Sequence, residues 1–387
     1  MGVPNPFTPS FGKIPPYMAG RADIIAEMGQ AFEGGAGNPN LSTLFVGPRG
    51  TGKTALLFNL AREAAARGWV CANVSALPGM LDDVAERTVE ASRHLTDEDS
   101  GSRLTGFNIG QIVGFEWEPK PSDSGNWRTR MSRILDGLAA QGTGLLITVD
   151  EVRPELPEMI QLATVYQQFV AEDRKVALLM AGLPSKISAL LRDESVSFLR
   201  RSCRYRLGRI SDGDIESALR LTVEEAGRTI GEDALLAAVD AIGGFPYMMQ
   251  LVGFRMWAQH PGEGAISLAD ARAGIVLAQR DLRERVLEAT FYDLSEGDVR
   301  MLEAMLQDPR ESRLTDLAAR LGKGGNYVSA YKKRLIEQGV IGERGRSAVA
   351  FELPGFREYL AERMEESLQA GMATSIEDCV PEAQLEW

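Results

Sequence analysis

A glycine-rich run, GPRGTGKT, extends from Gly47 to Thr54 and combines residue types that can hold phosphate groups. Its three glycines allow the backbone to curl so that successive N–H groups point inward. Lys53 can reach the β- and γ-phosphates of a nucleotide, and the Thr54 hydroxyl suits Mg²⁺. The run has the spacing G-x-x-x-x-G-K-[ST] and lies between an apolar strand pattern and an Ala- and Leu-rich helical pattern, the context that this motif requires. It predicts a site for Mg-ATP or ADP made by Gly47, Pro48, Arg49, Gly50, Thr51, Gly52, Lys53, Thr54 and Ala55.

Two acidic residues, Asp150 and Glu151, end a second apolar run, LLITVDEV. Asp150 can hold Mg²⁺ together with Thr54, and Glu151 can orient and deprotonate an attacking water. A solvated strand end followed by a helix N-cap is the alternative interpretation. The phosphate loop upstream favours hydrolysis, so Lys53, Asp150 and Glu151 are the predicted catalytic residues. The next apolar run ends in MAGLP, which offers no side-chain donor and receives no catalytic role.

Arginines crowd the stretch LLRDESVSFLRRSCRYRLGRIS. An arginine that reaches the γ-phosphate of a neighbouring subunit stabilises charge in the transition state. Arg200 and Arg201 are the candidates for this role, which would require a homo-oligomer. The alternative is a solvated basic helix end paired with Asp193 and Glu194.

Short apolar runs alternate with helical patterns in the first half of the chain. Runs rich in Val, Leu and Ile are typical of buried parallel strands, and the helical patterns between them provide the crossovers. The predicted strands are Leu41 to Val46, Trp69 to Val74, Gly144 to Val149 and Lys175 to Ala181. The predicted fold class is therefore α/β, with a doubly wound parallel sheet.

Composition limits the class of protein. The chain has 387 residues and a net charge of −12, so any nucleic-acid contact must be local. Its three cysteines and two histidines are too scattered for a disulfide framework or a zinc site. No apolar run approaches the ~20 residues of a membrane span, and the first residues do not have the pattern of a secretory signal. These features predict a cytoplasmic protein.

Changes in pattern divide the chain into four segments. Residues 1–207 are predicted to form the ATPase core, which includes an insertion over residues 95–126, predicted as a hairpin or extended segment without an assigned role. Residues 208–290 are predicted to form an all-helical lid domain because the strand signal vanishes there. Residues 291–360 form a third unit, and residues 361–387 an acidic C-terminal tail.

The third unit combines three helical patterns with a basic hairpin, which predicts a winged helix-turn-helix. Its third helical pattern, NYVSAYKKRLIEQG, is predicted to bury Val328, Tyr331 and Leu335. Between Pro309 and Arg346 there are nine Lys or Arg and four Asp or Glu, a net charge of +5. This local charge favours contact with duplex DNA, and a packing or protein-binding module is the alternative. The predicted DNA contacts are Asn326, Ser329, Lys332, Lys333, Arg344 and Arg346.

The sequence from Pro15 to Leu360 resembles the AAA+ and STAND superfamily, specifically archaeal-type ATPases related to origin-recognition initiators. The resemblance is carried by PPYMAGRADIIAEM, GPRGTGKT, LLITVDEV, MAGLP, SFLRRSCRYRLGRIS, GGFPYMMQLVG and the winged-helix pattern. It implies that a segment around Pro16, Tyr17, Gly20 and Arg21 approaches the adenine end of the nucleotide, and that Gly244 and Pro246 close over it from the lid.

One departure from the AAA+ pattern concerns the lid helix, where YMMQ stands in place of the usual arginine. That arrangement resembles STAND proteins.

These features lead to two main hypotheses. The first is an ATP-switched DNA-binding protein that hydrolyses ATP slowly. The second is a STAND-type signalling or defence switch, in which ATP controls oligomerisation and the winged helix binds protein. A small-molecule kinase is a weak third, because it leaves Glu151, the helical domain and the winged helix without purpose.

Overall fold

The computed structural model describes residues 3–10, 13–93, 124–260, 262 and 264–377. They belong to two compact units, one formed by Thr8–Ala218 and the other by Met1–Phe7 with Leu219–Trp387. The insertion predicted over residues 95–126 lies outside the described residues except for its last three, which begin a helix. None of the described helices combines the length and apolar character needed to cross a membrane.

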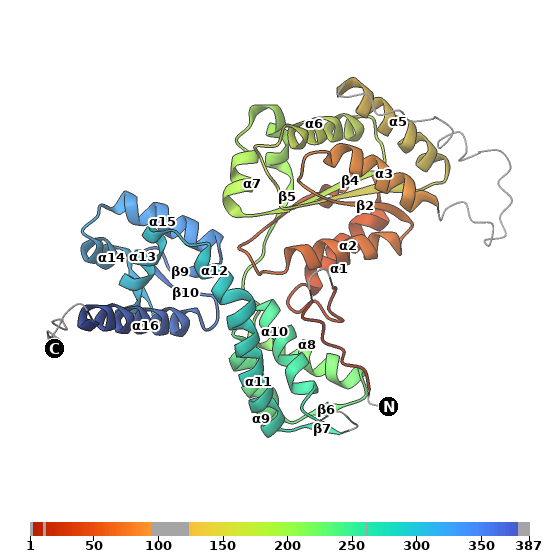
Figure 1. Ribbon diagram of the computed structural model, residues 1–387. Coiled ribbons are helices and arrows are strands. Elements are labelled where there is room, and N and C mark those ends of the chain that lie inside the picture. The colour runs from red at the N-terminus through yellow and green to blue at the C-terminus, as the bar shows by residue number, and fades with distance from the viewer. Residues whose placement is uncertain (1–2, 11–12, 94–123, 261, 263, 378–387) are drawn as a thin grey trace, which may run out of the picture. The chain divides into compact units, whose positions relative to one another are not determined.

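A parallel five-stranded sheet forms the centre of the first unit (Figure 1), with the order β2-β3-β4-β1-β5. The α/β class predicted from the sequence is confirmed. The fifth strand was not predicted, because the arginine-rich sequence that forms it contains no apolar run. The strands are β1 (Ser42–Val46), β2 (Trp69–Ser75), β3 (Gly144–Asp150), β4 (Val176–Gly182) and β5 (Cys203–Arg206).

Helices cover both faces of this sheet, as a parallel sheet with buried strands requires. One face carries α3, α5 and α6, and the other carries α1 and α2 (Figure 1). Alternate residues of β4 serve the two faces: Leu178 and Met180 belong to one core, and Leu179 to the other. The helices are α1 (Ala22–Gly34), α2 (Lys53–Ala65), α3 (Met80–Ser92), α5 (Ser124–Ala140), α6 (Pro157–Ala171) and α7 (Pro184–Leu190), with short 3₁₀ segments at Pro39–Leu41 and Glu194–Arg201.

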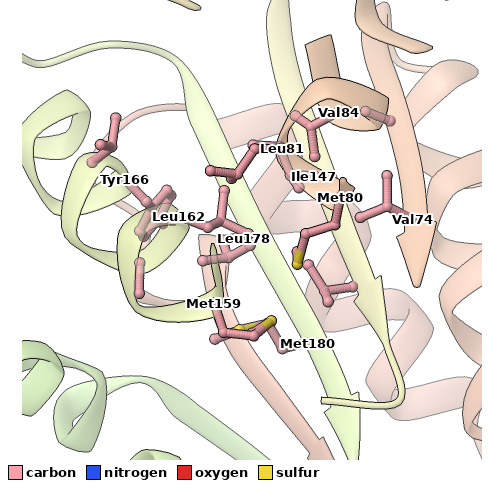
Figure 2. Close-up of a cluster of buried hydrophobic side chains, with 14 of the residues drawn as sticks. Val74, Met80, Leu81, Val84, Ile147, Met159, Leu162, Tyr166, Leu178 and Met180 are labelled. Atoms are coloured by element: carbon pink, nitrogen blue, oxygen red, sulfur yellow. The ribbon is translucent and has the colours of Figure 1, made fainter. Parts of the chain in front are cut away.

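The larger core joins α3 and α6 to the middle of the sheet. Figure 2 shows Met159 of α6 beside Met180 of β4, and Met80 of α3 near Val74 of β2. The buried indole N–H of Trp127 donates to the carbonyl of Leu81 at 2.7 Å, which ties α5 to α3. These contacts fix the strands whose carboxyl ends carry the candidate site.

Helices dominate the second unit up to Tyr292. They are α8 (Asp212–Glu225), which begins in the first unit, α9 (Glu232–Ile242), α10 (Pro246–Trp257), α11 (Leu268–Leu282) and α12 (Glu288–Tyr292), with a π-helical turn at Arg283–Leu287. The prediction of an all-helical segment is wrong in one detail, because β6 (Thr229–Ile230) pairs in parallel with β7 (Ala265–Ile266). Two residues per strand are too few to give a periodic signal in the sequence.

A small helix and sheet assembly follows. It contains α13 (Glu296–Leu306), β8 (Ser312–Arg313), α14 (Leu314–Leu321), α15 (Gly325–Glu337), β9 (Ile341–Arg344), β10 (Ala348–Phe351) and α16 (Phe356–Glu377). The strands are antiparallel in the order β8-β10-β9. The segment predicted as an acidic C-terminal tail, residues 361–387, begins within α16, which continues to Glu377.

The first residues of the chain pack into the helical unit. Phe7 is 1% exposed and lies against Gly253 of α10, where a Cβ atom would come within 2.3 Å of the Phe7 ring. The Asn5 side chain donates to the carbonyl of Phe254 at 3.0 Å. The two units are thus joined by two stretches of backbone, one at Phe7–Thr8 and one at Ala218–Leu219.

We predict that Phe7→Ala lowers the free energy of unfolding by about 3–5 kcal/mol, because it empties a closely packed site beside Gly253. Phe58→Ala is the matched control, since Phe58 is 38% exposed on α2 and its loss should cost far less. Denaturant unfolding followed by circular dichroism measures both. Equal, small losses would contradict the packing described for Phe7.

Candidate nucleotide-binding site

The predicted phosphate loop connects β1 to α2, at the carboxyl edge of the sheet. Gly50 and Gly52 have φ angles of 78° and 80°, a region that favours glycine. Gly47 has no room for a side chain, because a Cβ atom there would lie 2.5 Å from the carbonyl oxygen of Leu207. The glycines therefore permit both the curl of the loop and its close approach to the chain after β5.

Backbone donors of the α2 N-terminus face this loop. Gly52 is the N-cap residue and supplies no side-chain cap to the first turn. Unsatisfied N–H groups and the partial positive charge of a helix N-terminus favour an anion. Within the loop, the Thr51 hydroxyl donates to the carbonyl of Pro48 at 3.0 Å, which holds the curl, while Arg49 and Gly50 are exposed.

Lys53 is folded into the loop. Its Nζ donates to the carbonyl oxygens of Gly47 at 2.9 Å and Pro48 at 2.5 Å. Burial lowers the pKa of the Lys53 ammonium to about 8, and the charge of Asp150 opposes that shift. A partly desolvated cation held by carbonyl oxygens is well placed to exchange them for phosphate oxygens.

Thr54 and Asp150 meet across an intervening strand. The Thr54 hydroxyl donates to Oδ2 of Asp150 at 2.5 Å. Asp150 ends β3 and Thr54 lies in the first turn of α2, which follows β1, and β4 lies between β1 and β3. Oδ1 of Asp150 accepts a hydrogen bond from the backbone N–H of Glu151 at 2.9 Å. Hydroxyl and carboxylate oxygens are ligands that Mg²⁺ accepts, usually with phosphate and water completing its shell. Among the described residues, no group of three or more His, Cys, Asp or Glu side chains could hold a metal ion.

Glu151 stands next to this pair in an unusual backbone conformation. Its φ angle is 54°, which is uncommon for a residue other than glycine and marks local strain. Its side chain is 74% exposed and lies 4.0 Å from Arg153. Glu151 thus follows Asp150 directly, but its side chain is directed to solvent. To act as a general base, the side chain would have to turn toward the phosphate loop.

The end of β4 supplies backbone contacts to the site. The Gly182 carbonyl accepts a hydrogen bond from the N–H of Gly47 at 3.3 Å, and the Ala181 carbonyl accepts one from Val152 at 3.0 Å. This segment, predicted to lack a side-chain donor, ties the phosphate loop to the chain after Asp150.

The segment before α1 lies against the end of β5 and the start of α8. The Arg21 guanidinium donates to the carbonyl of Gly208 at 3.0 Å, and burial lowers the Arg21 pKa. Gly20 has a φ angle of 64°, and a Cβ atom there would lie 3.2 Å from Asp214. Pro16 is exposed and Tyr17 is half-buried. Because the chain after β5 also borders Gly47, this segment and the phosphate loop share a neighbour.

The remaining predicted nucleotide contacts, Gly244 and Pro246, belong to the other unit. They lie between α9 and α10, where Gly244 has a φ angle of 82° and Pro246 is the first residue of α10. The geometry is that of a helix-to-helix turn.

The predicted trans arginines lie at the far edge of their own sheet. Arg200 and Arg201 come before β5, at its amino end. β1 runs parallel to β5, and the phosphate loop follows the carboxyl end of β1. The Arg200 guanidinium donates to the carbonyl of Leu191 at 2.8 Å. Arg201 is exposed and has no ion pair among the described residues. Both precede the amino end of β5, whereas the phosphate loop follows the carboxyl end of β1, so the role predicted for them is one toward a second copy.

The predicted DNA contacts differ in their surroundings. Asn326, Ser329 and Lys333 are exposed on α15, and Arg346 is exposed in the β9–β10 turn; the other two contacts are ion-paired, Lys332 with Glu343 at 2.7 Å and Arg344 with Glu352 at 2.9 Å. The prediction that Val328 and Leu335 are buried is confirmed, whereas Tyr331 is half-buried against Gly297.

Sequence reasoning missed the part that β5 and the chain after it play in the site. The Leu207 N–H donates to the Val46 carbonyl at 2.8 Å, and the Leu207 carbonyl closes one side of the loop at Gly47. The sequence signal for β5 was the alternation of less polar and charged residues in CRYR. Its tyrosine, Tyr205, stacks on Phe45 of β1 with ring centres 5.6 Å apart.

The fold of the chain matches those of solved ATPases. The Walker-type ATPase PABY2304 of Pyrococcus abyssi has a TM-score of 0.63 and 12% identity, over 89% of this chain and 96% of that one. The ORC2 protein of Aeropyrum pernix, solved as ADPNP–ADP complexes, has a TM-score of 0.60 and 15% identity, over 94% and 98%. A family described as a domain of unknown function, DUF8462, matches residues 284–360, and no curated protein matches the sequence. The chain therefore has the α/β fold of P-loop ATPases.

The pKa of Lys53 gives the site a testable dependence on pH. Only the protonated ammonium attracts phosphate, so as the pH rises through about 8 the affinity for ATP should fall, approaching about tenfold per pH unit. Equilibrium binding of a fluorescent ATP analogue measures this. In Lys53→Arg, whose guanidinium stays charged, affinity should be weaker but independent of pH. A parent affinity that stays flat across this range would contradict the buried position of Lys53.

Proposed function

We propose that the protein is an ATP-binding switch that hydrolyses ATP slowly and couples its nucleotide state to duplex DNA. The observation that supports this best is the hydrogen bond between Thr54 and Asp150, beside a lysine held within the phosphate loop. Thr54 begins the helix that follows β1 and Asp150 ends β3, with β4 between the two strands, and a site for Mg-triphosphate would account for their meeting. The ADPNP and ADP complexes of the Aeropyrum pernix neighbour are in keeping with this proposal.

The binding step uses groups that face one point at the carboxyl edge of the sheet. Loop and α2 N–H groups would hold the β-phosphate, and Lys53 would leave the carbonyls of Gly47 and Pro48 for the phosphate oxygens. Thr54 and Asp150 would hold Mg²⁺, which neutralises charge on the phosphates when bound. Gly20, Arg21 and the neighbouring residues would line the adenine end, with Gly244 and Pro246 closing from the lid.

In this proposal hydrolysis is slow because Glu151 is turned away from the site and the end of β4 provides no side-chain donor. Glu151 would act as the general base, but its side chain is directed to solvent. The end of β4 offers only backbone groups near the γ-phosphate. Arg201 of a second copy would add transition-state stabilisation, so assembly would control the rate. Slow turnover suits a switch whose bound state carries the information.

The DNA-binding part of the proposal rests on the C-terminal assembly. Its helices α13, α14 and α15, followed by the β9–β10 hairpin, suit a winged helix with α15 in a major groove. Asn326, Ser329 and Lys333 share the exposed surface of α15. The net charge of +5 between Pro309 and Arg346 contrasts with −12 for the chain and favours phosphate contact here.

A second candidate function, a STAND-type switch, is favoured by the lid helix. The first arginine of α10 is Arg255, which forms a two-pronged ion pair with Asp281 of α11 at 2.6 and 2.7 Å. An arginine held in this way is committed to the packing of its own unit. In this candidate ATP would control oligomerisation, and the winged helix would bind protein.

ATPase turnover with and without duplex DNA tests the proposal. We expect DNA to change turnover of the parent protein. Lys53→Ala should abolish turnover, because the triphosphate loses its main cation. Lys333→Glu should keep basal turnover and lose the response to DNA, because it places a negative charge against phosphate.

Arg272→Glu is the control for charge reversal, since Arg272 is exposed on α11, a helix that is not part of the proposed DNA-binding surface. It should keep both turnover and response. Turnover that ignores DNA in the parent, while Lys53→Ala still removes it, would favour the STAND-type candidate. Unchanged turnover in Lys53→Ala would overturn both candidates.

A further inference from the structure

The three-stranded sheet places an arginine of β8 in line with the hairpin. Arg313 of β8 pairs with Ala348 of β10, and Ala348 pairs in turn with Arg344 of β9. Directly opposed residues of antiparallel strands project from the same face of a sheet. Arg313 and Arg344 are therefore on one face, separated by the small side chain of Ala348.

A backbone hydrogen bond joins this row to the hairpin turn. The N–H of Leu314, the first residue of α14, donates to the carbonyl of Ser347 at 2.9 Å. Arg313 and Arg346 are the chain neighbours of this bonded pair, so both belong to the same end of the sheet. Residues from before α14 and from the hairpin thus meet, although over thirty positions of sequence separate them.

The arginines of this row differ in how much of their charge is available. Arg344 donates to the carboxylate of Glu352 at 2.9 Å. Arg313 and Arg346 are exposed, and neither has an ion pair among the residues that the structure describes. Two uncompensated guanidinium groups at one end of a small sheet attract an anion more strongly than the paired Arg344 can.

We propose that Arg313 is a phosphate contact of the DNA-binding surface, acting together with Arg346. This inference rests on the proposed function and adds β8 to the surface otherwise formed by α15 and the β9–β10 hairpin. Strands lie about 4.8 Å apart, so the backbones of Arg313 and Arg344 are separated by roughly 10 Å. Arg346 lies two residues beyond Arg344 in the hairpin turn, and long arginine side chains at such a spacing can contact neighbouring phosphates of one DNA strand.

A charged side chain on an edge strand has another use, which is to discourage pairing with other sheets. Either sign of charge serves that purpose. An arginine with this role alone would not change the salt dependence of DNA binding. The salt dependence therefore separates the two roles, because each phosphate contact contributes a slope of about 0.9 in a plot of log affinity against log salt.

The test measures the affinity of the 387-residue chain for duplex DNA across a salt series, for the parent, Arg313→Gln and Arg272→Gln. Arg272 is exposed on α11 and, like Arg313, has no ion pair among the described residues, so its variant loses the same charge outside the sheet. We expect Arg313→Gln to bind more weakly at low salt, with a slope reduced by about 0.9. Arg272→Gln should keep the parent slope.

Each outcome has a distinct meaning. A parent slope in Arg313→Gln, with DNA binding intact, would overturn the contact at Arg313 and leave the proposed function standing. Equal reductions in both variants would also overturn it, because the effect would then follow overall charge. Absence of DNA binding by the parent would overturn the proposed function together with this inference.

Discussion

The hydrogen bond from Thr54 to Asp150 ties together the two halves of the candidate site. It exists because β1 and β3 are parallel and end at the same edge of the sheet, on either side of β4. β4 must leave space at that edge, and it ends in Ala181 and Gly182, whose carbonyls bind the chain on both sides. A side chain at Gly182 would meet Val152 and Ile187 at 3.1–3.2 Å. The end of β4 is thus packed too closely for a side chain at Gly182.

A second constraint is the position of the Lys53 ammonium. Burying a cation is costly unless polar groups surround it, and here the carbonyls of Gly47 and Pro48 do so. Those oxygens carry only partial charge, so a triphosphate is a better partner. The loop is therefore suited to binding an anion. Beside it, Glu151, the proposed general base, has a strained backbone and an exposed side chain.

Much of this site could be predicted from the sequence, since strand, loop and helix are consecutive around Gly47 and the motif spacing fixes the position of Lys53. The acidic strand end at Asp150 was predicted from the same logic. β5 was not predicted, because CRYR is a short edge strand whose two arginines are exposed and which contains no apolar run. Its role depends on Tyr205 stacking on Phe45, a contact between distant parts of the chain.

The C-terminal assembly shows the same division. Its helices follow from apolar spacing, but the charge that each basic residue retains depends on tertiary contacts. Lys332 and Arg344 form ion pairs with Glu343 and Glu352. The position of Arg313 beside the hairpin depends on β8, a strand of two residues that no periodic pattern in the sequence reveals. Sequence reasoning finds basic segments, and the fold decides which of their charges remain available.

The most direct test of the account is the effect of Mg²⁺ on binding of a slowly hydrolysed ATP analogue, compared between the parent and Asp150→Asn. Asp173→Asn is the control, since Asp173 is exposed, also has a positive φ angle of 54° and lies away from the loop, after α6. We expect Mg²⁺ to strengthen binding in the parent and in Asp173→Asn, and to have little effect in Asp150→Asn. An equal strengthening in Asp150→Asn would show that the metal is not held between Thr54 and Asp150, and would contradict the account.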